Sequence, residues 1–142
     1  DRRGVLRNLS RKDIRFGYRN SNLDTYIVLE AQLQLKSGDR KLTKIRMNDF
    51  LLSRTKKQDY SKPNAGCIFK NPSPQLSAGQ LIEQSGCKGM RCGGAKVSEK
   101  HANFILNFNS ATANDVIKLI GRVKARVKKT SGIELKEEIR IV

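Results

Sequence analysis

Residues 112–132 read TANDVIKLIGRVKARVKKTSG, and they predict the longest helix of the chain. Thr112 can cap the start of this helix, and Asp115 stands near its positive end. Apolar side chains recur every three or four residues, the spacing of one helix face: Val116, Leu119, Ile120, Val123 and Val127. Basic residues occupy the other faces, and Gly132 ends the pattern. The stretch therefore predicts an amphipathic helix with one face in the core.

Two shorter helices are expected before this one. Residues 43–56 carry a ragged apolar face after a threonine that can cap the helix. Residues 78–85 follow a capping box, in which Ser77 and Gln80 each satisfy a free amide of the other. Gly86 is suited to end this second helix in the left-handed conformation.

Three strands complete the expected fold. Residues 25–35 alternate apolar and polar side chains, which predicts a half-buried strand that stops at the turn Ser37-Gly38-Asp39. Short apolar runs predict two further strands, at residues 104–106 and 133–142. The order of elements predicts an α+β fold in which helices pack on a small mixed sheet.

The composition points to an anionic partner. The 142 residues contain 29 Lys and Arg against 13 Asp and Glu, a formal net charge of +16. Nucleic acid, membrane headgroups or a phosphorylated small molecule would all suit this charge. A basic nucleic-acid-binding module is the alternative function, although aromatic residues are few and RNA-binding motifs are absent. No apolar run reaches the roughly 20 residues of a membrane helix. Asp1 is not a natural initiator, so we expect a longer protein.

The loop Asn64-Ala-Gly-Cys-Ile-Phe-Lys-Asn-Pro72 holds the chemistry-bearing residues. Gly66 allows a positive φ and would place the thiol of Cys67 at the lip of a turn. Lys70 and Asn71 offer a cation and amide hydrogen bonds, which suit phosphate or carboxylate. A tight turn with a simply buried cysteine is the other reading.

A metal site is not expected. Cys87, Cys92 and His101 lack a CxxC pair and a fourth ligand. Three cysteines without a secretory segment fit a reducing cytosol. A lone histidine at the start of a strand is expected to be structural.

Several motifs at ordered spacing resemble one family, the UDP-N-acetylenolpyruvoylglucosamine reductases, flavoenzymes that make the muramic acid unit of bacterial peptidoglycan. The motifs are FGYRNS at 16–21, NAGCIFKNP at 64–72, AGQLIEQ at 78–84, KG at 88–89, GGAKVS at 93–98, HAN at 101–103, ATANDV at 111–116 and LKEEIR at 135–140. The resemblance implies that residues 1–38 are the end of a FAD-binding domain and residues 39–142 a substrate-binding domain. The first flavin domain is missing from this sequence, so we expect the chain alone to be inactive.

The resemblance also implies the reaction. NADPH reduces FAD, and the flavin reduces UDP-N-acetylglucosamine enolpyruvate to UDP-N-acetylmuramate in the cytoplasm, for cell-wall growth, shape and division. Arg19 and Glu138 match residues that meet the substrate carboxylate, and Cys67 matches the proton donor. The positions matched to substrate binding are Tyr18, Lys70, Asn71 and Gln84.

Two positions depart from the family pattern. Cys67 stands where most members carry serine, and our hypothesis is that the thiol still donates the proton. A free thiol has a pKa of about 8.5, so activity should fall as it ionises. Asp59 stands where the family often has proline after the glutamine, and it is expected to loosen the turn into the loop.

Overall fold

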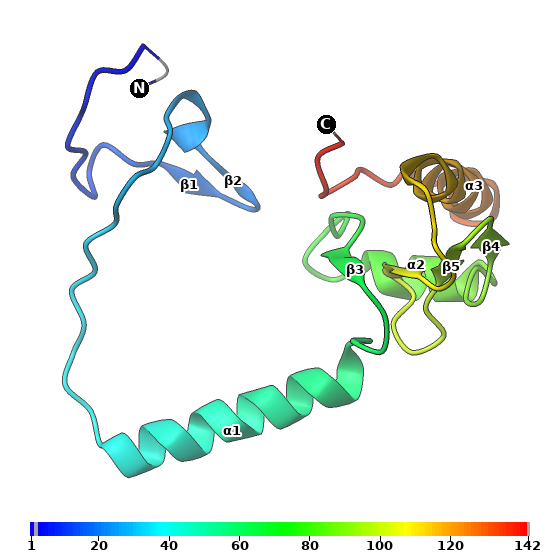
Figure 1. Cartoon of the computed structure of the whole chain (residues 1–142), viewed down its shortest axis with the longest axis horizontal. Helices are drawn as coiled ribbons and strands as arrows, with labels where there is room; N and C mark the ends of the chain where they lie inside the picture. Colours follow the sequence, from blue (N-terminus) through cyan, green and yellow to red (C-terminus); the bar gives the residue numbers. More distant parts are fainter. Residues whose placement is uncertain (2, 142) are drawn as a thin grey trace. The chain divides into compact units, whose positions relative to one another are not determined.

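The computed structural model describes residues 1 and 3–141, and the chain divides into two compact units, Asp1–Asp39 and Arg40–Val142 (Figure 1). The first unit contains a two-stranded antiparallel hairpin of β1 (Phe16–Gly17) and β2 (Asn20–Ser21), followed by the 3-10 turn η1 (Asn22–Thr25). Whether this unit is the end of a flavin-binding domain stays a prediction.

The predicted strand at residues 25–35 is wrong for this chain. After η1 the backbone runs without strand pairing to any described residue, and its apolar side chains stay exposed, with Leu33 at 77% and Leu35 at 83%. The period of two decides which side chains would share a face, but a strand forms only when a neighbour supplies the ladder of hydrogen bonds. No described residue supplies that neighbour.

The second unit is built on a four-stranded sheet. Its strands are β3 (Asn64–Cys67), β4 (Arg91–Cys92), β5 (Ala95–Val97) and β6 (Phe104–Asn107), in the order β3-β6-β5-β4. The α+β class and the strand predicted at residues 104–106 are confirmed. The sheet is antiparallel in every described pairing rather than mixed. Short connections explain the antiparallel pairing of β4 with β5 and of β5 with β6, because parallel neighbours need a crossover of a dozen or more residues.

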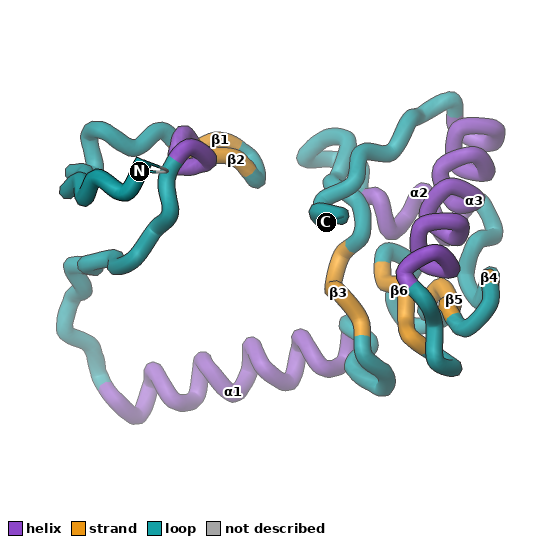
Figure 2. Tube along the Cα trace, turned by 45° about the horizontal axis from the view of Figure 1, so that its top comes forward, coloured by secondary structure: helices purple, strands orange, loops and turns teal. Residues whose placement is uncertain are grey.

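All three predicted helices are confirmed, as α1 (Arg40–Lys57), α2 (Ala78–Gln84) and α3 (Ala113–Ser131). The predicted cap of the first helix is wrong, because α1 begins before Thr43 and includes it. Capping boxes start α2 and α3, and Gly132 ends α3 at a φ of 72°. Figure 2 shows α2 and α3 beside the sheet, whereas every residue of α1 is exposed. The C-terminal end of α1 is held by Lys100, whose Nζ donates to Thr55 O at 2.7 Å. Among the described residues, no helix is long and apolar enough to cross a membrane.

The core of the second unit lies between the sheet and the two helices α2 and α3. Its buried members come from α2, α3, β5, β6, the residues that follow β3 and the segment after α3. They include Ile68, Phe69, Leu81, Ile82, Val97, Ile105, Leu119, Ile120, Val123, Val127 and Leu135. Four of the five residues of the predicted α3 stripe are fully buried, and Val116 packs at the edge. The apolar face of α3 therefore packs into the core of the second unit.

The predicted final strand at residues 133–142 is wrong over most of its length. Within its described part it forms one antiparallel bridge, between Glu137 and Phe69. The neighbouring strand β3 ends at Cys67, and the backbone bonds to this segment come from Ile68 and Lys70, which follow that strand. A pattern of apolar residues cannot reveal that the partner is this short.

Candidate functional site

The loop after β3 is shaped by a glycine and an asparagine. Gly66 adopts a φ of 76°, as predicted, and its N–H donates to Asn64 Oδ1 at 2.9 Å. The register between β3 and β6 shifts between Asn64 and Cys67, which marks an irregularity in the strand. Cys67 follows it, half-buried, opposite Phe104. The loop therefore leaves the sheet at Cys67 with the thiol next to the distortion.

Glu138 lies beside this loop through its backbone. Its N–H donates to Ile68 O at 2.8 Å, and the N–H of Lys70 donates to Lys136 O at 2.9 Å. The structure therefore brings the half-buried Glu138 next to the residue that follows Cys67. Two of the three predicted catalytic positions, from distant parts of the sequence, lie on adjacent segments.

The adjacent glutamate has a different environment. Glu137 Oε1 accepts from Lys124 Nζ of α3 at 2.8 Å, and this hydrogen bond lowers the pKa of the Glu137 carboxyl. The carboxylate of Glu137 is thus bound to a lysine of α3.

Asn71 and Gln84 lie at opposite ends of α2. Asn71 Oδ1 accepts from the N–H of Ala78 at 3.1 Å, the first residue of α2, so this carboxamide helps to cap the helix. Gln84 is exposed in the last position of α2. At 1.5 Å per residue, Ala78 and Gln84 are about 9 Å apart along the axis. Asn71 and Gln84 are therefore not brought into contact with one another.

Tyr18 and Arg19 form the turn of the hairpin in the first unit. Both are exposed, and Arg19 has a positive φ of 55°, which is uncommon for a residue other than glycine. Because they lie in the other unit, their approach to Cys67 and Glu138 stays a prediction.

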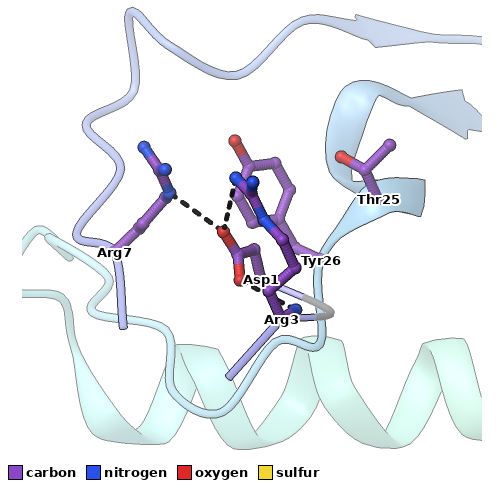
Figure 3. A pocket seen from close by; sticks show the side chains of 5 residues that line it. All are labelled: Asp1, Arg3, Arg7, Thr25 and Tyr26. Atoms are coloured by element: carbon purple, nitrogen blue, oxygen red, sulfur yellow. Dashed lines mark hydrogen bonds and ion pairs between the residues drawn. The ribbon is translucent and has the colours of Figure 1, made fainter. Parts of the chain in front are cut away.

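The first unit also contains a pocket lined by Asp1, Arg3, Arg7, Thr25 and Tyr26 (Figure 3). Its two guanidinium groups face the carboxylate of Asp1, whose Oδ2 lies 3.3 Å from Arg7 Nε and 3.7 Å from Arg3 Nη2. An anion entering this pocket would compete with that carboxylate. The pocket contains none of the residues predicted for the site.

The second unit packs Cys87, Cys92 and His101 in or against its core. Burial raises the pKa of the Cys87 thiol, and Cys92 packs at the edge of the core. The imidazole of His101 lies against the ring of Phe104, tilted by 59° with the ring centroids 4.6 Å apart, and burial lowers the pKa of His101. In residues 1 and 3–141, no group of three metal-binding side chains occurs.

Asp59 tightens the approach to the loop instead of loosening it. The residue is only 9% exposed, and Oδ1 accepts from the hydroxyl of Ser61 at 2.6 Å. Oδ2 accepts from the hydroxyl of Ser98 at 2.6 Å, which ties the end of the α1 segment to the loop between β5 and β6. These bonds, that from Ser61 first, lower the pKa of the Asp59 carboxyl. The expectation of a looser turn is wrong because a carboxylate accepts bonds that proline would not.

Asn103 is the residue that the sequence reasoning missed. It is 3% exposed, and its carboxamide bonds the main chain of Phe69. The available signal was a carboxamide directly before the apolar run Phe104-Ile-Leu106, since a polar side chain entering a buried strand needs a partner.

Comparison with known proteins agrees with this architecture. A family model described as the C-terminal domain of UDP-N-acetylenolpyruvoylglucosamine reductase matches residues 58–142. A protein named UDP-N-acetylenolpyruvoylglucosamine reductase from Heliobacterium modesticaldum is 46% identical over 144 residues, covering 100% of this chain and 46% of its own length. The protein of the same name from Thermotoga maritima is 42% identical over 94% of this chain and 48% of its own length.

A solved structure gives the same result. The crystal structure of UDP-N-acetylenolpyruvylglucosamine reductase from Thermus caldophilus is similar with a TM-score of 0.76 and 37% identity, over 91% of this chain and 46% of that one. The chain spans about half the length of the curated relatives it matches. With the family model covering residues 58–142, the chain belongs to the UDP-N-acetylenolpyruvoylglucosamine reductase family.

Proposed function

We propose that the chain is the substrate-binding part of a cytoplasmic flavoenzyme that reduces UDP-N-acetylglucosamine enolpyruvate to UDP-N-acetylmuramate with NADPH. The observation that carries this proposal is the pairing of the 67–71 loop with residues 136–138, through the bonds of Ile68 O and Lys70 N. This pairing places a thiol and a carboxyl on adjacent segments, beside a lysine and a carboxamide. A nucleotide-sugar diphosphate whose sugar carries an enolpyruvyl ether needs those groups: a proton donor, a carboxylate partner and anion-binding donors.

The flavin is expected to bind elsewhere. The residues around Cys67 are a thiol, a cation, a carboxamide and a carboxyl, which suit the anionic substrate, and we assign no flavin-binding residue within residues 40–141. FAD would supply the hydride when it is bound by the remaining half of a protein of the length of the relatives. This chain supplies the groups that bind and protonate the substrate.

The residues of this chain act on the charge that develops during reduction. Hydride addition to the methylene carbon places an electron pair on the adjacent carbon, delocalised into the carboxylate as an enolate. The guanidinium of Arg19 stabilises this charge, a contribution of several kcal/mol in comparable sites. The side chain of Glu138 meets the same carboxylate. The Sγ–H of Cys67 transfers its proton to the carbon, and the thiolate regains a proton from water.

The nucleotide end of the substrate is assigned to the remaining residues. Lys70 is half-buried next to Asn71, and Asn71 Oδ1 is engaged by Ala78 N–H. The NH₂ group of the same carboxamide is then oriented as a donor toward the diphosphate. Tyr18 and Gln84 complete the predicted binding set.

Exposed apolar residues support a partner domain. Leu33 and Leu35 are 77% and 83% exposed, and Phe50 and Leu52 of α1 are 75% and 59% exposed. We propose that the rest of the flavin-binding part packs against residues 33–35, because exposed apolar side chains that lie close together mark interaction surfaces.

Binding of the substrate to this chain tests the proposal. Calorimetric titration with UDP-N-acetylglucosamine enolpyruvate should show binding, and Lys70→Ala should weaken it by about 10- to 100-fold, the loss of one charge-assisted hydrogen bond. Lys129→Ala is the matched control, since it removes an equal charge from an exposed position at the end of α3. Equal effects of both variants would contradict the assigned site. Salt-dependent DNA binding without affinity for the UDP-sugar would favour the nucleic-acid-binding alternative.

A further inference from the structure

Asn103 holds the loop after Cys67 with three hydrogen bonds. The N–H of Ile68 donates to Asn103 O at 2.9 Å, and the N–H of Phe69 donates to Asn103 Oδ1 at 2.9 Å. The Nδ2 group of Asn103 donates back to Phe69 O at 2.8 Å. Asn103, Ile68 and Phe69 are all nearly inaccessible, at 3%, 1% and 2% exposure, so water cannot replace these bonds at low cost.

The opposite edge of the loop is held by the C-terminal segment. Ile68 O accepts from the N–H of Glu138, and Lys70 N–H donates to Lys136 O. Residues 68–70 therefore lie between Asn103 on one side and residues 136–138 on the other. The main-chain path of these three residues determines where Cys67 leaves the sheet and where Lys70 and Asn71 begin.

Asparagine is chemically suited to this position. The Phe69 main chain offers one donor and one acceptor, and a carboxamide matches both at once in a planar group. β6 begins only at Phe104, so the side chain of Asn103 extends the backbone pairing of Cys67 with Phe104 by one step. An apolar side chain would leave a buried N–H and C=O without partners, and an ionised carboxylate would accept from the N–H but repel the carbonyl.

We propose that Asn103 is a positioning residue for proton transfer in this enzyme, acting through the 67–71 loop. The inference rests on the proposed function of Cys67 and Glu138. By fixing Phe69 from one side while Glu138 bonds Ile68 from the other, Asn103 sets the separation between the thiol and the carboxyl. A misplacement of about 1 Å between reacting groups can cost about 10²-fold in rate.

The test uses Asn103→Asp in the flavin-loaded enzyme that contains this chain, with the two half-reactions measured separately. Reduction of the flavin by NADPH should stay within about twofold of wild type. Oxidation of the reduced flavin by UDP-N-acetylglucosamine enolpyruvate should fall about 10²-fold at pH 8. Asn107→Ala is the matched control, because Asn107 is an exposed asparagine of β6 whose Oδ1 accepts from Ala111 N–H at 2.8 Å. Its two half-reactions should both match wild type.

Lowering the pH provides a rescue that a merely structural role would not show. A carboxylic acid at position 103, once protonated, donates and accepts as the carboxamide does, and burial favours this neutral form. The rate ratio of Asn103→Asp to wild type for flavin oxidation should therefore rise at least about fivefold between pH 8 and pH 6. A constant ratio, equal losses in both half-reactions, or an unchanged rate at pH 8 would overturn the inference.

Two further outcomes separate the possible failures. A wild-type enzyme that shows no oxidation of its flavin by the substrate refutes the proposed function itself. If Asn103→Asp does not fold at pH 8, hydrogen exchange of the wild-type chain decides instead. The amide of Phe69 should then exchange as slowly as the strand amide of Ile105, and exchange as fast as an open loop amide would overturn the inference.

Discussion

Gly94 should be among the least replaceable residues of the second unit. It lies in the turn between β4 and β5, where a Cβ atom would stand 2.0 Å from Asn109 O and 2.5 Å from Ala111 N. Both are backbone atoms, and Cβ contacts under 3.0 Å essentially never occur, so the Gly94→Ala variant requires a main-chain shift of about 1 Å. That shift works against two hydrogen bonds, because Gly94 O accepts from Phe108 N at 2.9 Å and Asn109 N at 3.0 Å.

The expected cost follows from these contacts. Two weakened hydrogen bonds contribute about 1 kcal/mol each, and overpacking adds about 1–3 kcal/mol. Gly94→Ala should therefore lower the free energy of unfolding by about 3–5 kcal/mol, measured by denaturant titration of the chain. Gly121→Ala is the control, because a Cβ atom there meets nothing within 4 Å. It should raise stability by about 0.5–1 kcal/mol, since alanine is favoured within a helix. A Gly94→Ala variant within about 1 kcal/mol of wild type would refute the reasoning.

Three further predictions concern caps and carboxylates. Hydrogen bonds, of which the one from Ser61 has the largest effect, hold the pKa of Asp59 below its ordinary value. The ionised carboxylate therefore stabilises the fold fully when the pH is above that ordinary value, and this stabilisation is lost as the pH falls below it. Asp59→Asn should flatten the acid decline of unfolding free energy, and an unchanged decline would contradict this role. Thr112→Ala, which removes the cap of α3, should cost about 1 kcal/mol in denaturant titrations; no loss would mean that the cap is not formed. Glu138→Ala should slow oxidation of the reduced flavin by substrate at least about tenfold, whereas Glu137→Ala should not, since Glu137 pairs with Lys124; equal effects would argue against Glu138.

Local signals in the sequence were sufficient for the helices. A capping box begins α2 and another begins α3. A glycine of positive φ lies near the end of each helix, Gly86 after α2 and Gly132 after α3. These features depend on residues within a few positions of one another. The buried face of α3 followed from the same short-range periodicity.

The strands depended on partners that local patterns do not reveal. Residues 25–35 have the alternation of a strand but no described neighbour to pair with. Residues 133–142 meet only the short segment around Phe69, so a single bridge forms in their described part. Register and strand length are non-local properties, and one sequence specifies them only through its contacts.

In the candidate site, too, the contiguous residues could be predicted from the sequence and the contacts between distant residues could not. The loop of Cys67, Lys70 and Asn71 was visible because its residues are contiguous. Asn103 was missed because its carboxamide acts on Phe69, 34 residues away. The capping role of Asn71 on Ala78 also arises from tertiary folding, since it joins residues seven apart across a loop.

The central claim is that the thiol of Cys67 protonates the substrate, and rapid-mixing measurement of flavin oxidation tests it most directly. In the flavin-loaded enzyme, Cys67→Ala should lose about 10²- to 10⁴-fold in the rate of oxidation by UDP-N-acetylglucosamine enolpyruvate, with flavin reduction by NADPH unchanged. Cys67→Ser should retain a rate within about tenfold of wild type. The wild-type rate should fall as pH rises through about 8.5, where a free thiol ionises, and the Cys67→Ser rate should not. Full turnover by Cys67→Ala, or the same alkaline fall in Cys67→Ser, would contradict the account.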